Sequence, residues 1–308
     1  MTRVSTGGNY GNVLSNIMAA QQRQMEAGNA VATRKKGEDL KDYARNAEFL
    51  TAMRSVDTRL GGFLEQNKII ADKLTTQDFA LNQVGESAAS TKQAIEEAIA
   101  TGRTDTLMQE IEAHFRNSVS GMNSRYAGKY LFAGGKIDTQ PVTAQSMADL
   151  TTPPAIIADF FENDDFITEH KVDDSTVVKT GILAEDLGTD ILTAYQTIQA
   201  FHEGPDAFGG QMTDAQRTFL EGQLSVWDDL YSDTIDRTAR NGMVQARVEG
   251  VKADLVTRQD SLRGMIGDIT DADLAEAASA LEQATLSLQA STQVFLSLKE
   301  SSLLNVLR

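Results

Sequence analysis

The 308-residue sequence has no cysteine and only four prolines, and each shortage narrows the possible classes of protein. Without cysteine the chain cannot form disulfides, zinc–thiolate sites or a thiol nucleophile. No apolar run reaches the roughly 18 residues that a membrane helix needs, and the mean hydropathy is -0.29. The composition is therefore typical of a water-soluble protein with no membrane partner.

Basic residues are also few relative to acidic residues. The chain has 28 Lys and Arg against 44 Asp and Glu, a formal net charge of -16. Nucleic acids and anionic membranes are bound by basic surfaces, so neither is an expected partner. The first 20 residues lack both a basic leader and an apolar core, so we expect no cleaved signal peptide. These features fit either a cytosolic protein or one that is exported unfolded through a narrow channel.

The prolines and the acidic charge are concentrated in one part of the chain. The prolines are Pro141, Pro153, Pro154 and Pro205. Residues 137–210 also hold 14 acidic residues against two lysines, a net charge of -12. The runs STVVKTGIL (175–183) and AIIADFF (155–161) favour strands there. We therefore predict a mainly α fold, in which both chain ends form a long helical bundle or coiled coil around a small inserted, β-containing outer domain.

The first flank has a sustained heptad pattern typical of a long amphipathic helix. Two interleaved rows form the apolar seam of this helix. The first row is Met53, Leu60, Asn67, Leu74, Leu81, Ala88 and Ile95, in which Asn67 is polar. The second row is Val56, Phe63, Ile70, Val84 and Ala98. Gln77 and Thr91 interrupt the second row. Further amphipathic helices are predicted from Leu107, from Leu187 and after Thr213, which is a candidate N-cap. Most of these stripes are expected to form a core within the chain.

Both chain ends carry apolar stripes with no evident core of their own to join. The candidate assembly residues are Leu14, Ile17, Met18, Met25, Leu274, Ala277, Leu281, Ala284, Leu288, Ser291, Phe295, Leu298, Leu303, Leu304 and Leu307. Thr270 or Asp271 is the predicted cap of the C-terminal helix. The small members of the stripe permit close approach of another helix. The terminal helices could therefore pair with neighbouring copies or with each other inside one chain.

No pattern of residues in the sequence indicates catalysis. His114, His170 and His202 are isolated and lack metal-ligand spacing. The glycine clusters lack phosphate-loop spacing, and the acidic pairs lack the spacing of a calcium-binding loop. We expect no enzymatic activity, cofactor or metal.

Several segments resemble bacterial flagellins and their junction relatives. The segment from Gly267 to Arg308 resembles the flagellin C-terminal helix, with an Asp-rich cap, DADLAEA, and Leu/Ala/Gln heptads ending in SLL. The segments ARNGMVQARVEGVKADL (239–255) and QQRQMEAGNAVATRKKGEDLKDYA (21–44) are similar to further flagellin segments, the second loosely. The turn GKYLFAGGKIDTQPV (128–142) resembles that of the hook–filament junction protein, hook-associated protein 3 type. The resemblance covers residues 1–135 and 187–308.

The resemblance implies a structural flagellar protein that joins hook to filament. Residues 1–40 and 268–308 would form a terminal coiled-coil assembly domain, 41–136 and 187–267 a helical bundle domain, and 137–186 the inserted acidic outer domain. Such proteins leave the cell unfolded by type III export and assemble outside it on the flagellum. The implied partners are further copies of the chain, a hook-side junction protein, flagellin and a cytoplasmic export chaperone.

Three other readings remain open on the sequence. The chain could be flagellin, the main filament subunit, because flagellins carry a related turn. It could be a sensory or binding module on a helical stalk, although no signalling motif or membrane segment supports this. It could also be a peptidoglycan hydrolase, although no catalytic constellation supports that.

Overall fold

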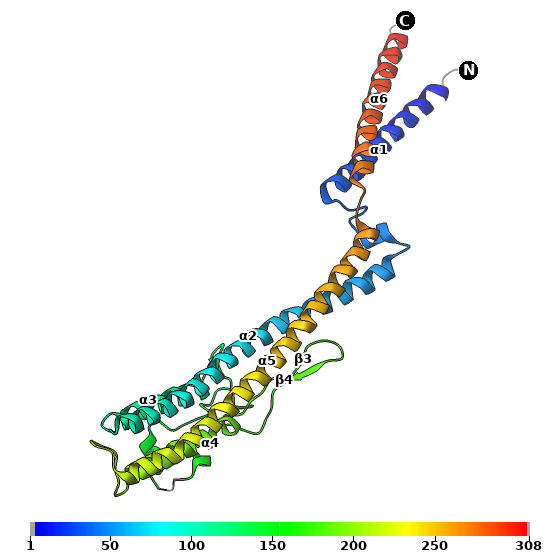
Figure 1. Cartoon of the computed structure of the whole chain (residues 1–308). Helices are drawn as coiled ribbons and strands as arrows, with labels where there is room; N and C mark the ends of the chain where they lie inside the picture. The colour runs from blue at the N-terminus through cyan, green and yellow to red at the C-terminus, as the bar shows by residue number, and fades with distance from the viewer. Residues whose placement is uncertain (1–3, 154, 307–308) are drawn as a thin grey trace. The chain divides into compact units, whose positions relative to one another are not determined.

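The computed structural model describes residues 4–153 and 155–306, and the side chains of residues 11–153 and 155–299. Six α-helices make up most of this part of the chain (Figure 1). They are α1 (Val4–Thr33), α2 (Ala47–Thr101), α3 (Leu107–Met122), α4 (Ala184–His202), α5 (Asp214–Thr270) and α6 (Leu274–Val306). Two short antiparallel hairpins are present, β1 (Arg125–Tyr126) with β2 (Lys129–Tyr130), and β3 (Glu169–Lys171) with β4 (Val177–Lys179). The predicted mainly α fold with a small β-containing part is confirmed.

Two compact units make up the described chain. One consists of residues up to 59 and from 258 onwards, and the other of residues 60–257. We call them the terminal unit and the body unit. The helices α2 and α5 contribute residues to both. None of the described helices is long and apolar enough to span a membrane. The predicted three-part division of the chain stays a prediction.

The body unit has one large core built from α2, α3, α4, α5 and the inserted segment. At its centre Tyr195 contacts two other aromatic rings edge-on, Phe115 at 5.3 Å and Trp227 at 4.6 Å between ring centroids. The Tyr195 hydroxyl lies 3.1 Å from the Thr91 hydroxyl and 3.4 Å from that of Ser118. Burial raises the pKa of Tyr195 to about 12, because the interior disfavours the phenolate.

The α2–α3 contact depends on a glycine. A Cβ on Gly121 would lie 2.8 Å from Val84 Cγ2 and 3.1 Å from the Ala80 carbonyl oxygen. Such contacts are too short for an unstrained side chain, and the second is with backbone that cannot rotate away. The absence of a side chain therefore lets the backbones of the two helices approach closely.

The YLFAG turn, residues 130–134, is a buried connection. Tyr130, Leu131, Phe132 and Ala133 are all buried, and Gly134 has a φ of 66°, which favours glycine. The Phe132 carbonyl accepts a hydrogen bond from Ala184 N at 2.9 Å, which anchors the start of α4. These residues therefore hold the end of the helical body against the first turn of the returning helix.

The inserted segment contains little strand. The run AIIADFF forms a 3₁₀ turn, η3 (Ile157–Phe160), followed by a single bridge between Phe161 and Val142. The prediction of a strand there is wrong because the apolar side chains Phe160 and Phe161 pack on the core from a turn. A second 3₁₀ turn, η2 (Met147–Thr151), places Met147 in the same core.

The β3–β4 hairpin packs on α2 and α5 of the body unit (Figure 1). Val172 and Val178 are buried against Ile70, Leu74 and Val248. Asn67, the polar member of the α2 heptad row, donates from Nδ2 to the Val172 carbonyl at 2.9 Å. A polar residue is therefore accommodated in this apolar row because its amide satisfies a hairpin carbonyl.

Hairpin docking should weaken on mild acidification. His170 in β3 is half-buried with an unpartnered Nε2, and burial, then the charge of Lys73, lowers its pKa below 6.5. Below pH 6.5 His170 therefore binds more protons in the undocked state than in the docked state. The free energy of docking becomes less favourable as the pH falls towards the lowered pKa, and below that pKa it no longer changes. Hydrogen exchange of the Val172 amide, corrected for intrinsic rate, should show this fall between pH 7.5 and 5. The fall should be absent in His170→Leu, and a pH-independent protection in the unchanged protein would contradict the assignment.

Candidate assembly surface

The two terminal helices pack side by side within the terminal unit (Figure 1). Ala20 and Ala27 of α1, and Ala277 and Ala284 of α6, are buried between them. Gln24 Nε2 of α1 donates to Thr285 Oγ1 of α6 at 3.2 Å. Small side chains at the contact let the helices approach closely. Of the two pairings that the sequence left open, the structure shows pairing within one chain.

Backbone hydrogen bonds join the segment that follows α1 to the end of α5 and the connection before α6. Lys36 N donates to the Thr270 carbonyl at 2.8 Å, and Ala272 N donates to the Arg34 carbonyl at 3.0 Å. Lys35 Nζ contacts Asp271 Oδ1 at 2.5 Å, and this ion pair lowers the pKa of Asp271. The segment that leaves α1 is therefore held to the α5–α6 connection by both backbone and side chains.

The cap of α6 differs from the prediction. Thr270 is the last residue of α5 and Asp271 pairs with Lys35, so neither caps the helix. Asp273 Oδ1 instead accepts from Ala275 N at 2.8 Å and from Glu276 N at 3.2 Å. The prediction missed Asp273 because three candidate capping residues lie within four positions of the sequence.

Removing this cap should weaken the first turn of α6. Asp273→Ala leaves two backbone N–H groups without their acceptor, which costs about 1 kcal/mol of helix stability. Hydrogen exchange of the Ala275 and Glu276 amides should accelerate by about fivefold on this scale. The matched variant Asp273→Asn keeps an acceptor and should exchange almost as slowly as the unchanged protein; equal acceleration in both variants would contradict the cap.

The predicted assembly residues fall into two groups in the structure. Ile17, Ala277, Leu281, Ala284, Leu288, Ser291, Phe295 and Leu298 are buried or half-buried. Leu14, Met18, Met25 and Leu274 are exposed. The side chains of Leu303 and Leu304 lie outside the described residues, as does the whole of Leu307. The heptad rows of α6 therefore contribute to the contact within the chain, and their part in assembly stays a prediction.

An exposed apolar stripe lies on the outer side of α1. Leu14, Met18 and Met25 are spaced by four and seven residues, so they lie on one face of the helix, and they are 52%, 63% and 63% exposed. Three such side chains in one row are unusual for a helix that has no further partner. The stripe is available to an apolar surface beyond the chain itself.

The helix α6 also carries exposed apolar residues that the sequence analysis missed. Leu286 is 59% exposed, and Val294 and Leu296 are about as exposed. They lie outside the heptad rows, so no periodic signal singled them out. We call Leu14, Met18, Met25, Leu286, Val294 and Leu296 the outer apolar set.

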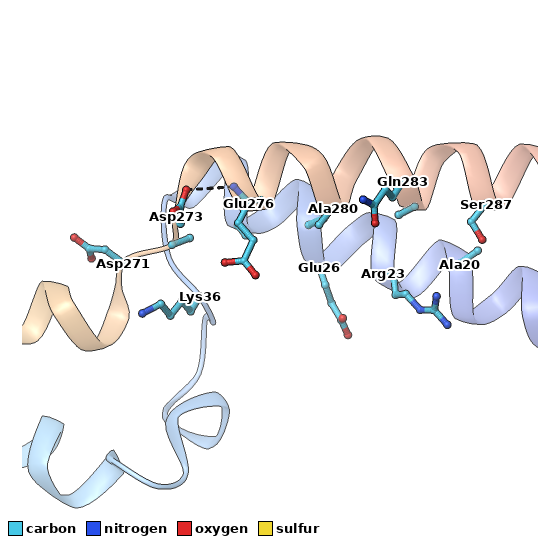
Figure 2. A pocket seen from close by; sticks show the side chains of 15 residues that line it. Ala20, Arg23, Glu26, Lys36, Asp271, Asp273, Glu276, Ala280, Gln283 and Ser287 are labelled. Atoms are coloured by element: carbon cyan, nitrogen blue, oxygen red, sulfur yellow. Dashed lines mark hydrogen bonds between the residues drawn. The ribbon is translucent and has the colours of Figure 1, made fainter.

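A groove of about 890 Å³ runs along the helix pair. Its alanines include Ala20 and Ala280, and its polar side chains include Arg23, Glu26 and Gln283 (Figure 2). Because alanine leaves space between the helix backbones, the groove can accept the ridge of side chains of a third helix. Within the described residues no cluster of three or more His, Asp or Glu could hold a metal ion. The geometry is that of a packing surface for helices.

The fold resembles that of two solved proteins of the bacterial flagellum. A flagellar hook-associated protein from Vibrio parahaemolyticus superposes with a TM-score of 0.62 at 15% identity, covering 75% of this chain and 100% of that chain. FlgL from Bacillus cereus superposes with a TM-score of 0.53 at 16% identity, covering 71% and 99%. The chain therefore has the fold of flagellar hook-associated proteins.

The comparison with protein families matches one region of the chain. Residues 224–307 match the family description "Bacterial flagellin C-terminal helical region", which spans the later part of α5 and α6. No curated protein sequence matches the chain. Flagellins and hook-associated proteins are structural components without enzymatic activity, which agrees with the prediction that the chain is not an enzyme.

Proposed function

We propose that this chain is a structural subunit of the bacterial flagellum that assembles with other copies through its terminal helix pair. The observation that carries the proposal is the outer apolar set, which stays exposed although α1 and α6 already pack on each other. An isolated helix pair gains nothing from such residues, whereas a ring or helical array of copies would bury them. The flagellin-like sequence of residues 224–307 supports the same role.

We further propose that the subunit is the adaptor between hook and filament. The shared fold with hook-associated proteins supports this position, as does the buried YLFAG turn, which resembles that of the junction protein. Its neighbours would then be a hook-side junction protein and flagellin. The three-part division predicted from the sequence, with an outer segment at 137–186, belongs to this proposal.

The proposed route to the flagellum is export in the unfolded state. Absence of cysteine means that no disulfide has to be avoided or reformed during passage. A cytoplasmic chaperone would cover the apolar residues of α6 before export, because unassembled copies would otherwise associate through them.

The main alternative is flagellin itself, favoured by the match at residues 224–307. Immunogold electron microscopy of intact flagella, with antibody against residues 137–186, separates the two positions. Label confined to the end of the hook would support the adaptor. Label along the whole filament would make the chain a filament subunit, and absence of label from flagella would refute both.

A further inference from the structure

A small pocket in the body unit is cationic although the chain is strongly acidic. Its volume is about 200 Å³, and it lies between α2, α5 and the segment that follows β4. Lys179, Arg237 and Arg240 line it, and no acidic side chain does. In a chain with 28 basic against 44 acidic residues, this local excess of positive charge favours an anionic occupant.

One residue that lines the pocket, Gln77, has a buried acceptor without a donor. Gln77 is 1% exposed, and its Oε1 has no hydrogen-bond partner among the described residues. Its amide orientation is fixed by a chain of bonds: Asn241 Nδ2 donates to the Leu74 carbonyl at 3.0 Å, so Asn241 Oδ1 accepts from Gln77 Nε2 at 3.1 Å. Gln77 Oε1 is therefore left without a donor, and a buried acceptor is costly to leave unpaired. An occupant that brings an N–H would remove this cost.

The cations can accept a further carboxylate. Arg237 pairs with Asp233 at 2.7 Å and Lys179 with Glu169 at 3.5 Å, and both acids are largely exposed. Exposed pairs of this kind are weak and can be shared or exchanged. Arg240 forms no ion pair with any residue in the described part of the chain. The pocket therefore has one uncommitted cation and two that are held loosely.

The remaining wall of the pocket is apolar. It is formed by Leu74 and by two half-buried residues, Ile182 and Val244. A complementary occupant combines a carboxylate, an apolar side chain and a backbone N–H. An acidic peptide with a neighbouring apolar residue has all three groups, whereas inorganic anions have no apolar part and no N–H.

The chain itself contains an exposed segment with a carboxylate, an apolar side chain and backbone N–H groups. Asp165, Phe166 and Ile167 form an exposed run, with Phe166 60% exposed. The neighbouring Asp164 is already engaged, because its Oδ1 accepts from Gly135 N at 2.6 Å and Phe166 N at 3.1 Å. Asp164 therefore fixes the shape of the loop and leaves the side chain of Asp165 facing solvent.

We propose that the cationic pocket binds residues 165–167 of a second copy of the chain. The carboxylate of Asp165 pairs with Arg240, the side chain of Phe166 contacts the apolar wall, and a backbone N–H donates to Gln77 Oε1. The assignment to a second copy rests on the proposed function, since assembly brings copies side by side. The chemistry of the pocket itself does not depend on assembly.

The first test uses a labelled peptide and the full chain at a concentration where it is monomeric. A peptide of residues 162–170 should bind saturably by fluorescence anisotropy, and Arg240→Glu should weaken binding by about tenfold through loss and reversal of one contact charge. Arg247→Glu makes the same charge change on α5 outside the pocket and should leave binding unchanged. Absence of saturable binding, or equal weakening in both variants, would overturn the proposal.

A charge swap in assembled protein tests the source of the segment. Arg240→Glu should lower incorporation into flagella, and Asp165→Lys in the same chain should restore it, because each copy then presents a matching pair to its neighbour. Peptide binding without this rescue would overturn the assignment to a second copy. If Arg240→Glu is incorporated normally and the peptide does not bind, this proposal alone is overturned. The proposed function is tested separately, by variants of the terminal helices that fail to be incorporated into flagella.

Discussion

Replacing Leu286 with aspartate should leave a folded, exported protein that is at least a hundredfold less well incorporated into flagella. Burying a leucine at an interface contributes about 1.5–3 kcal/mol, which corresponds to about a tenfold to a hundredfold change in association. Burying a carboxylate there without a partner adds a further penalty of several kcal/mol. The expected loss is therefore larger than that of removing the leucine side chain alone.

The fold of the free chain should tolerate this change. Leu286 is 59% exposed in the terminal unit, so the change removes little packing within the chain. Aspartate at a helix interior position costs about 0.5 kcal/mol relative to leucine. Circular dichroism of the purified variant should therefore show unchanged helix content and a similar melting temperature.

The measurement compares variant protein in purified flagella with variant protein in the culture medium, both by immunoblot. Protein in the medium but not in flagella would separate failed assembly from failed export. Ile156→Asp is the matched control, since it changes a similarly exposed apolar side chain outside the helix pair and should be incorporated normally. Normal incorporation of Leu286→Asp would refute the role of the outer apolar set.

Leu281 shows why the outer residues give the cleaner test. It is half-buried, and its Cδ1 lies 3.9 Å from the position that a Cβ on Gly28 of α1 would take. Leu281→Asp would therefore separate α6 from α1 as well as affect assembly. A defect in that variant could not be assigned to contacts between copies, although the sequence pattern made Leu281 the more obvious choice.

The sequence predicted the helices well because their apolar residues are periodic and prolines confine the irregular segment. Periodicity identifies the apolar face of a helix but not the surface that covers it. The α6 rows were therefore assigned to assembly, whereas Ala277 and Ala284 are buried against α1. Leu286 has no periodic partner, so only the folded structure identifies it as an outward-facing apolar residue.

The polar interruptions of the α2 seam show the same limit. Asn67, Gln77 and Thr91 occur where apolar residues were expected, and each meets a different element: the hairpin, α5 and α4. These partners are more than 100 residues away in the sequence. A local pattern therefore marks such positions as exceptions without indicating which contact each one makes.

The second large effect is expected at the centre of the body unit, where Phe115→Ala should cost about 3–5 kcal/mol of unfolding free energy. Phe115 is fully buried and packs edge-on against Tyr195. Its removal leaves a cavity, and the surrounding helices cannot move in to fill it because each also packs on other elements of the core. The only tryptophan, Trp227, lies in the same cluster, so its fluorescence reports unfolding of this unit in a urea titration.

Phe79→Ala is the matched control for this experiment, because Phe79 is 70% exposed on α2 and its loss should change stability by less than about 0.5 kcal/mol. Phe115→Ala should lower the urea midpoint strongly with an unchanged slope, because the surface exposed on unfolding is nearly the same. Similar small shifts in both variants would contradict a single core in the body unit. A large shift confined to Phe115→Ala would show that the inserted segment, α3 and α4 unfold together with the long helices, since Met147, Ile111 and Ile191 belong to the same buried cluster.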